Sequence, residues 1–454
     1  MSLRAATHPP DGLANPQRLL AFSTLAMATA MAVLDASIVN VALPTMARDL
    51  AIAPARAIWI VNAFQLAVTV SLLPLSALGD SLGYRRVYWS GLALFTLSSL
   101  ACALAPSFAV LTMARLAQGL GAAGIMSVNI ALVRFIYPHA RLGQGVGNMA
   151  VVVAVSAAGS PSVAAAILSV ASWRWLFLVN VPIGALALVM AARNLPATPR
   201  AERQVDPSSV LLNAAAFGLL IMGLNGVGER GRLSIALIEI AAGAAIGVVF
   251  VQRQLKLAAP LLPVDLLRRP VFALSLATSI ASFAAQSLAL VALPFFFEDA
   301  LHRSETATGL LMTPWPVGTA LIAPIAGRLA DRFAPGVLGS IGLLVMASGL
   351  ALVALQVGEG GTVSLVWRLA ICGLGFGFFQ SPNNRLIIAS APRERSGGAA
   401  GLQSSGRLIG QSFGTALMAV AFGAAPEHAT SIALWGATAL TLIGACASGL
   451  RSAD

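Results

Sequence analysis

The sequence predicts an all-α polytopic membrane protein, built from two similar six-helix bundles with two further membrane helices between them. Three observations carry this prediction. Of the 454 residues, 58% are hydrophobic and only 10% are charged, whereas a soluble domain carries about 25% charged residues. The apolar residues are gathered into runs long enough to cross a bilayer. Short fragments of the first half recur in the second half in the same order.

The apolar runs divide the chain into fourteen predicted membrane helices. They lie at 19–44, 57–78, 87–105, 108–133, 145–168, 173–193, 208–226, 233–251, 271–297, 306–327, 336–357, 363–390, 400–423 and 430–450. The first run is longer than the apolar part of a cleaved signal peptide, so we expect it to be a membrane helix. Glycine and proline inside some runs are tolerated, because neighbouring helices satisfy the freed backbone groups.

The basic residues indicate how the chain is oriented. An even number of helices places both termini on the same side of the membrane. Most of the 28 basic residues fall on that side, so the positive-inside rule predicts cytoplasmic termini in a bacterial inner membrane. Because these residues lie between apolar runs rather than on one face, they argue against nucleic-acid binding.

An internal repeat is visible in three ordered matches. The stretch 41–44 (VALP) recurs at 291–294, 78–80 matches 329–331, and the Gly-Leu-Gly at 119–121 recurs at 373–375. The repeat unit of about 180 residues is shorter than the offset of about 250, so about 70 residues are inserted. We expect an N-terminal tail (1–17), a first bundle (18–195), a linker with two inserted helices (196–265) and a second bundle (266–454). Parallel repeats of this kind indicate alternating access, with a substrate site between the bundles.

Four stretches resemble signatures of one transporter family. Residues 34–44 (LDASIVNVALP) resemble its L-D-x-T-I-V-N-V-A-L-P element, and 115–123 (RLAQGLGAA) its R-x-x-Q-G-x-G-A-A element. Residues 80–86 (DSLGYRR) resemble the end of its G-x-x-x-D-R-x-G-R-R loop, and 173–184 its W-R-W-x-F-x-I-N-x-P-x-G stretch. The family is the major facilitator superfamily, specifically its fourteen-helix drug:proton antiporter branch. The resemblance covers nearly the whole chain and implies a secondary transporter that exports small lipophilic compounds in exchange for protons.

Asp35 and Arg115 are the candidate proton-coupling residues. Asp35 is the only acid deep within the first six predicted helices, and Arg115 lies about seven residues inside the fourth. Burial favours the protonated carboxyl, whereas a nearby arginine favours the carboxylate. A group balanced between these effects can load and release a proton. The alternative is a static structural ion pair.

Two cytoplasmic loops are the candidate gate. By resemblance, Asp80, Gly83, Arg85 and Arg86 in the first half, and Asp331 and Arg332 in the second, would lock the cytoplasmic side shut in one state. Gly83 allows a tight turn between helices. The alternative is a plain positive-inside loop.

Polar residues inside the predicted helices are candidates to line a substrate cavity. They are Asn62, Gln65, Asn129, Gln286, Gln380 and Asn383, with Gln403 and Gln411 in the thirteenth helix. Each could equally make an interhelical hydrogen bond. Glu239 in the eighth helix could attract a cation, and Glu298 and Asp299 are expected to be solvated. A cationic substrate would suit a cavity that holds Asp35, but the scarcity of deep acids leaves neutral or anionic substrates open.

Other function classes find little support in the sequence. No P-loop and no hydrolase motif occurs, so we expect neither ATP hydrolysis nor an enzyme. Cys102, Cys372 and Cys446 lie in separate apolar runs without metal-ligand spacing, so we expect no metal and no cofactor. The expected partners are a small-molecule substrate, protons and the bilayer, with the chain acting as a monomer. Two alternatives remain: a proton symporter that imports a metabolite, and a non-transporting receptor or scaffold.

Overall fold

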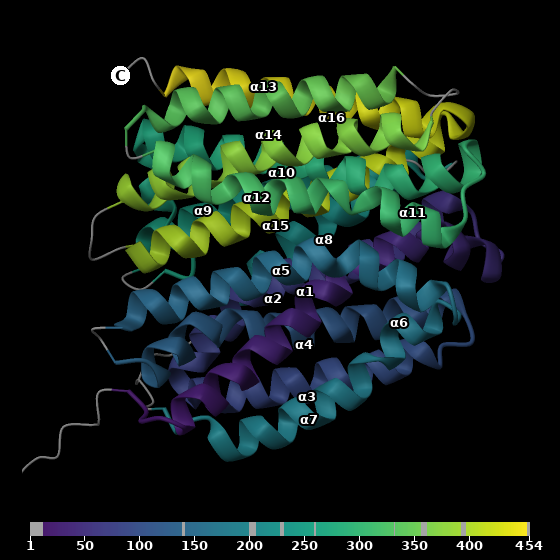
Figure 1. The fold of residues 1–454 in the computed structure, drawn as a ribbon. Helices are drawn as coiled ribbons and strands as arrows, with labels where there is room; N and C mark the ends of the chain where they lie inside the picture. The colour runs from purple at the N-terminus through teal and green to yellow at the C-terminus, as the bar shows by residue number, and fades with distance from the viewer. Residues whose placement is uncertain are drawn as a thin grey trace, which may run out of the picture.

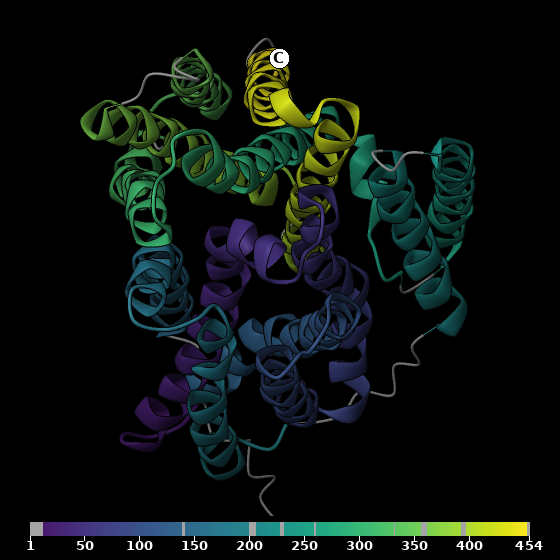
Figure 2. The same cartoon turned by 90° about the vertical axis from the view of Figure 1, so that its right-hand side faces the viewer.

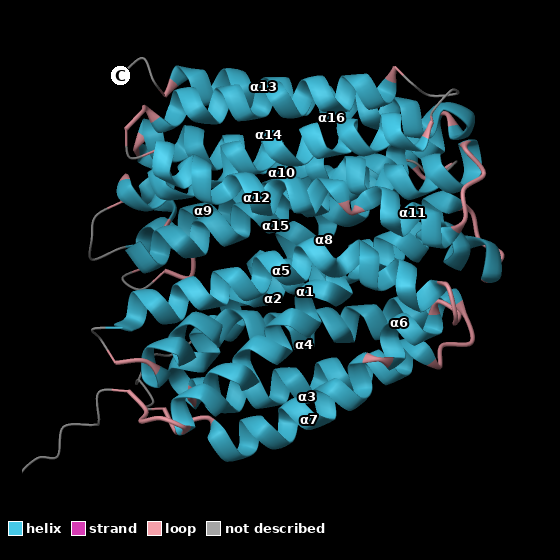
Figure 3. Cartoon of the chain, in the orientation of Figure 1, coloured by secondary structure: helices cyan, strands magenta, loops and turns pink. Residues whose placement is uncertain are grey.

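The computed structural model describes residues 12–138, 141–198, 206–227, 231–257, 260–330, 332–355, 361–391 and 396–451. Across these residues the chain is helical, and no strand occurs in the described part (Figure 3). The long helices run alongside one another between two ends of the molecule (Figure 1). The first helix begins and the last one finishes at the same end, which we call the terminal end; the opposite one is the far end.

Within the described residues the helices make fourteen spans, as predicted. The first half contains α1 (Gln17–Asp49), α2 (Pro54–Leu82), α3 (Tyr84–Ala103), α4 (Phe108–Ile136), α5 (Leu142–Leu168), and α6 (Arg174–Leu178) followed directly by α7 (Asn180–Asn194). Two inserted helices follow, α8 (Pro207–Val227) and α9 (Leu233–Lys256). The second half contains α10 (Pro270–Phe295), α11 (Glu305–Met312) with α12 (Pro314–Leu329), α13 (Pro335–Ala354), α14 (Thr362–Ala389), α15 (Ser396–Ala424) and α16 (Ala429–Leu450). Short helical turns lie at Val264–Arg268, Phe296–Ala300 and Pro426–His428.

Two of the predicted spans are interrupted, and most are longer than the apolar runs. The break between α11 and α12 falls at Thr313, directly before Pro314, because proline lacks the backbone N–H that would continue the helix. Helix α1 extends to Gln17 and Asp49. A helix can continue past its apolar run once its ends reach the interface.

The Gly-x-Gly pair of each half makes the same helix crossings. Gly119 lies against the backbone of α2 and Gly121 against that of α3. In the second half Gly373 lies against α12 and Gly375 against α13. A Cβ atom at any of these positions would overlap the neighbouring backbone, so only glycine allows the close approach.

An asparagine–hydroxyl contact recurs in the same way. Asn129 Nδ2 donates to Thr29 Oγ1 at 2.8 Å, and Asn383 Nδ2 donates to Ser279 Oγ at 2.8 Å. The two pairs are separated by the same offsets as the sequence repeats. The predicted repeat is therefore a repeat of structure, and the two six-helix bundles are pseudo-symmetric.

The apolar core shows where the bundles meet. One cluster joins far-end residues of both halves, among them Val39 and Leu43 from the first and Phe296 and Trp315 from the second. Toward the terminal end, a cluster within the first half takes a single described residue, Leu408, from the second. The second half has a separate cluster there. The bundles are therefore packed together at the far end and have separate cores at the terminal end.

The inserted helices lie beside the line along which α2 meets α15 (Figure 2). Helix α8 contacts both of these helices, and Asn213 Nδ2 donates to the Val70 carbonyl of α2 at 2.8 Å. Gln254 of α9 donates to Ser209 of α8 at 2.7 Å. The inserted pair therefore covers one side of the junction between the bundles.

Candidate functional site

The structure brings Asp35 and Arg115 together inside the first bundle. Asp35 lies on α1 and Arg115 on α4, and the distance from Arg115 Nη1 to Asp35 Oδ2 is 2.5 Å. Both side chains are buried: Asp35 is 2% exposed and Arg115 is 0% exposed. Neither faces lipid, so the pair is shielded from water and from the bilayer.

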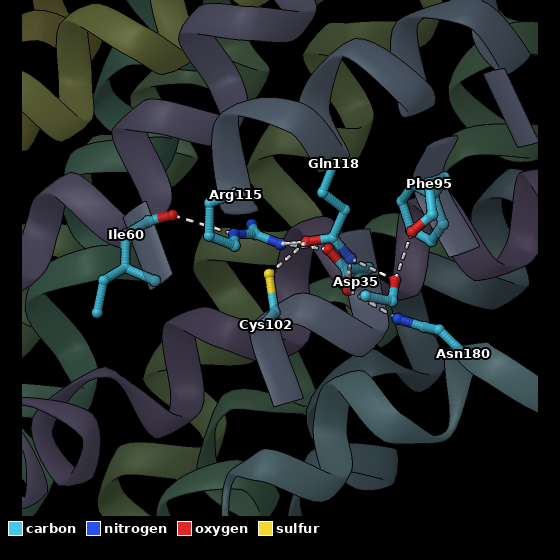
Figure 4. Close-up of polar contacts among 8 residues, drawn as sticks. Asp35, Ile60, Phe95, Cys102, Arg115, Gln118 and Asn180 are labelled. Atoms are coloured by element: carbon cyan, nitrogen blue, oxygen red, sulfur yellow. Dashed lines mark hydrogen bonds and ion pairs between the residues drawn. The ribbon is translucent and has the colours of Figure 1, made fainter. Parts of the chain in front are cut away.

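Three further side chains complete a hydrogen-bonded network around the pair (Figure 4). Gln118 Nε2 donates to Asp35 Oδ1 at 2.9 Å, and Asn180 Nδ2 donates to the same oxygen at 2.8 Å. Gln118 also donates to Ser99 Oγ at 2.8 Å and accepts from Arg115 Nη1 at 2.6 Å. Both oxygens of Asp35 therefore have donors, which come from α4 and α7.

The guanidinium of Arg115 has other partners on α2 and α6. Its Nε donates to the Ile60 carbonyl at 3.1 Å. Its carbon centre lies 4.3 Å from the ring centre of Phe64 and 5.6 Å from that of Phe177. Such cation–π contacts favour a charged guanidinium in an apolar setting. Arg115 and Gln118 are three residues apart on α4, which puts both on the helix face toward Asp35.

This geometry links the charge of Asp35 to the packing of the bundle. Removing one partner of a buried ion pair typically costs about 3–5 kcal/mol, because the other charge is left uncompensated. A proton on Asp35 would leave Arg115 in that state. The network can therefore accept a proton only if α1 shifts relative to α4 and α7, or if a new group compensates Arg115.

No equivalent network occurs among the described residues of the second bundle. Under the repeat offsets, the positions of Asp35, Arg115 and Gln118 correspond to Ala285, Leu369 and Cys372. All three are fully buried in the far-end core. The charged network is therefore a feature of the first half alone, whereas the helix crossings around it are shared.

The predicted gate residues of the first half gather at the terminal end. Gly83 has φ +94° where α2 turns into α3, a conformation that glycine adopts without strain. Tyr84 Oη donates to Asp80 Oδ1 at 2.6 Å, and Arg85 donates to the Ala192 carbonyl of α7. The side chain of Arg86 is exposed.

In the second half Arg332 is exposed at the end of α12, and Asp331 lies outside the described residues. The hydrogen bonds from Tyr84 to Asp80 and from Arg85 to Ala192 lie within the first bundle.

The predicted cavity residues fall into two groups. Asn129 and Asn383 are buried and bonded within their own bundles, and Asn383 also accepts from Arg451 at 2.5 Å. They therefore tie helices together. Asn62 is buried, and Gln65, Gln286 and Gln380 are half-buried.

The acid Glu239 of α9 pairs with Arg232 at 3.0 Å. It lies on a peripheral helix, away from both bundles' central helices.

An ion pair that was not predicted from the sequence lies at the far end. Glu298 was expected to be solvated, but it is 5% exposed and accepts from Arg48 of α1 at 2.7 Å. The expectation was wrong because Glu298 follows Phe295–Phe297, whose packing against the first half draws it inside. Asp299 is about half exposed and lies 3.4 Å from the same arginine. A usable signal was present: Arg48 and Glu298 are 250 residues apart, the repeat offset, so they face each other across the pseudo-symmetry axis.

A model of the Major Facilitator Superfamily matches residues 25–415. The chain belongs to the Major Facilitator Superfamily. It is accordingly a multi-pass membrane transporter, of a superfamily whose members bind small molecules and are typically not enzymes.

Relatives and solved structures agree with this assignment. Within the superfamily, the chain is 51% identical to the uncharacterized transporter YebQ of Escherichia coli, over 97% of each chain. It is 31% identical to the multidrug resistance protein Stp of Mycobacterium tuberculosis, over 89% of this chain and 76% of Stp. It is 28% identical to the riboflavin transporter RibZ of Clostridioides difficile, over 89% and 88%. An inward-facing, unoccupied bacterial homologue of the human lysosomal transporter Spinster shares the fold, with a TM-score of 0.70 at 16% identity over 97% of this chain and 98% of that one.

Proposed function

We propose that this transporter exports small lipophilic compounds in exchange for protons, as a monomer of the bacterial inner membrane. One observation carries the proposal: a fully buried carboxylate on α1 whose only cationic partner among the described residues is a fully buried arginine on α4. Ionisable groups in a membrane interior are costly and usually functional. Stp at 31% identity, and the tetracenomycin C resistance and export protein of Streptomyces glaucescens at 29%, support the export of drug-like compounds.

In this proposal the two bundles, residues 18–195 and 266–454, rock about the site between them while 196–265 stay at the side. The terminal end faces the cytoplasm, so the separate cores at that end correspond to a state that opens inward. The loop residues Asp80, Gly83, Arg85 and Arg86, with Asp331 and Arg332, close that side in the other state. A proton on Asp35 releases Arg115 from its acid, and that change in packing favours one state over the other.

A second candidate is a proton symporter that imports a metabolite. The antiporter branch that the sequence resembles carries a G-x-x-x-G-P-x-x-G-G element in its fifth helix, which marks exporters. Here the proline is kept as Pro161, but the glycines are replaced by Ser156, Ser160, Ala164 and Ala165. The similarity to the riboflavin transporter RibZ also favours a metabolite as substrate.

The test is growth of a pump-deficient bacterial strain on a panel of toxic lipophilic compounds. Wild type should raise the tolerated concentration of some compounds at least fourfold, and Asp35→Asn should abolish this effect at equal expression. Asp49→Asn is the matched control, because Asp49 is an exposed acid on the same helix. Equal resistance from wild type and Asp35→Asn would remove Asp35 from the transport cycle.

Everted vesicles separate the two directions of transport. For an exporter, adding substrate to acidified vesicles should release the proton gradient, and Asp35→Asn should prevent that release. For a symporter, an imposed gradient across right-side-out vesicles should drive substrate accumulation instead.

A further inference from the structure

Helix α15 carries an arginine that has no counter-charge. Arg407 lies eleven residues after the first residue of α15, or about 16 Å along the helix. Among the described residues, no acid pairs with it and no group accepts a hydrogen bond from it. Its side chain is half-buried.

The helix face that carries Arg407 is the one that looks between the bundles. Gln403, Arg407 and Gln411 are spaced by four residues, and Met418 and Phe422 continue the same face toward the far end. Met418 and Phe422 are buried in the core that joins the two halves. The stripe therefore lies on the face of α15 that meets the first bundle where the halves touch, and it continues toward the terminal end, where the two halves have separate cores.

The other faces of α15 are already occupied. Gly406 and Gly410 lie against α10. Ser412 lies 3.4 Å from Thr69 of α2, and Leu408 packs into the first bundle's core. The amides of Gln403 and Gln411 are half-buried, and within the described part of the chain their side chains have no hydrogen-bond partner. An arginine flanked by two amides without hydrogen-bond partners presents hydrogen-bond donors and neutral acceptors, but no negative charge.

Three acids of the spanning helices are held elsewhere in this state, and Asp80 at the terminal end accepts a hydrogen bond from Tyr84. Asp35 is sealed inside the first bundle by Arg115, Gln118 and Asn180. Glu239 is paired with Arg232 on α9, and Glu298 is held at the far end. An unpaired arginine within a membrane is costly, so a negative group from outside the protein would stabilise it.

We propose that Arg407, flanked by Gln403 and Gln411, binds the anionic group of an amphipathic small-molecule substrate in the space between the bundles. This inference rests on the proposed transport function and gives its substrate a charge. It replaces the expectation of a cationic substrate, whose premise was an Asp35 open to the cavity. Sulfonates, carboxylates and phosphate esters attached to an apolar body have the required chemistry, since a guanidinium binds such groups through two parallel hydrogen bonds.

The test compares two fluorescent probes with the same apolar body and opposite charge, 1-pyrenesulfonate and the 1-pyrenyltrimethylammonium ion. Equilibrium dialysis against the purified full-length protein in a non-ionic detergent measures binding, with empty micelles subtracted. Wild type should bind the sulfonate at least tenfold more tightly than the ammonium ion. Arg407→Gln should weaken sulfonate binding about tenfold, as expected for a charge-assisted hydrogen bond. Arg407→Lys should retain part of the affinity.

Arg193→Gln is the matched control, because Arg193 is an exposed arginine at the end of α7. It should leave the affinity for both probes unchanged. Equal affinity of wild type for the two probes, or an unchanged sulfonate affinity in Arg407→Gln that elutes as a folded monomer, would overturn the proposal.

An anionic lipid head group has the same chemistry as the proposed substrate group, so the assay is repeated in lipid nanodiscs. Discs of phosphatidylcholine alone and discs with added phosphatidylglycerol should give the same sulfonate affinity. If phosphatidylglycerol displaces the sulfonate from wild type but not from Arg407→Gln, Arg407 binds lipid and the substrate assignment fails. Because this binding needs no proton gradient, its outcome is independent of the Asp35→Asn growth test.

Discussion

Replacing Arg48 by glutamine should favour the state in which the far end is open. Arg48 reaches from α1 to Glu298 of the second bundle at 2.7 Å, and the Glu298 side chain is 1% exposed. Without Arg48, this carboxylate would keep only the Thr45 hydroxyl at 3.4 Å while the far end is closed. Opening the far end would return it to water.

The magnitude follows from the burial of the two partners. Breaking a fully buried pair costs about 3–5 kcal/mol. The Arg48 side chain is 54% exposed, so water screens the interaction and the cost falls to about 2 kcal/mol. Because each 1.4 kcal/mol is a factor of ten, Arg48→Gln should raise the ratio of open to closed far end about 30-fold.

The assay is a distance measurement between spin labels at Ala53 and Thr362, which are exposed at the far end of opposite bundles. The exposed Cys446 is first replaced by serine, and the buried Cys102 and Cys372 are left in place. In Arg48→Gln the fraction of long distances should increase.

Two further variants test the reasoning. Arg56→Gln, at an exposed arginine of the same end, should have little effect. Arg48→Gln combined with Glu298→Gln should be closer to wild type than Arg48→Gln alone, because no buried charge is then left unpaired. If the double variant opens further than the single one, the pair does not hold the far end closed.

Two other predictions concern stability. Gly121→Ala should lower the melting temperature in detergent sharply, by the equivalent of about 3 kcal/mol or more, because its Cβ would overlap the Phe95 backbone. Gly159→Ala is the control and should be tolerated, because a Cβ there meets no atom within 4 Å. Equal melting temperatures of the two variants would contradict the close helix crossing at Gly121. Hydrogen bonds from Arg253 hold the pKa of Asp206 well below its usual range. The Asp206 carboxylate therefore contributes fully to the free energy of unfolding above the pKa of about 4 that it has in the unfolded chain. This contribution is lost only as the pH falls through the lower pKa of the folded protein. Asp206→Asn should therefore change the melting temperature by the same small amount at pH 7.5 and pH 5, and a difference that vanishes at pH 5 would show that the pair does not lower this pKa.

Much of the fold could be predicted because bilayer physics leaves few choices. A run of about 20 apolar residues must be a helix in order to satisfy its own backbone. The repeat could be predicted at positions where only one residue type fits, such as Gly119 and Gly373. The breaks at Val179 and Thr313 were not predicted, although Pro314 follows Thr313 directly, because a proline inside a membrane helix often leaves the span continuous.

The candidate site was predictable in part. An acid and an arginine inside apolar runs are rare enough to indicate a pair, and the structure places Asp35 beside Arg115. The sequence could not predict that both side chains would be enclosed within the first bundle, because this depends on Gln118 and Asn180 reaching the same carboxylate from two helices. Similarly, nothing in the sequence around Glu298 shows that the phenylalanines before it will pack into the opposite half.

The absence of the Asp35 network from the second bundle has a consequence for energy coupling. Ala285, Leu369 and Cys372 give that half no acid and no arginine at the equivalent positions, whereas Arg407 is a half-buried arginine without an acidic partner among the described residues. Under the two proposals above, the proton and the substrate are bound by different halves of a duplicated fold. Coupling between the two binding events requires the contacts between the halves. Substitutions at the α1–α10 and α2–α15 contacts should therefore uncouple transport while leaving each binding event intact.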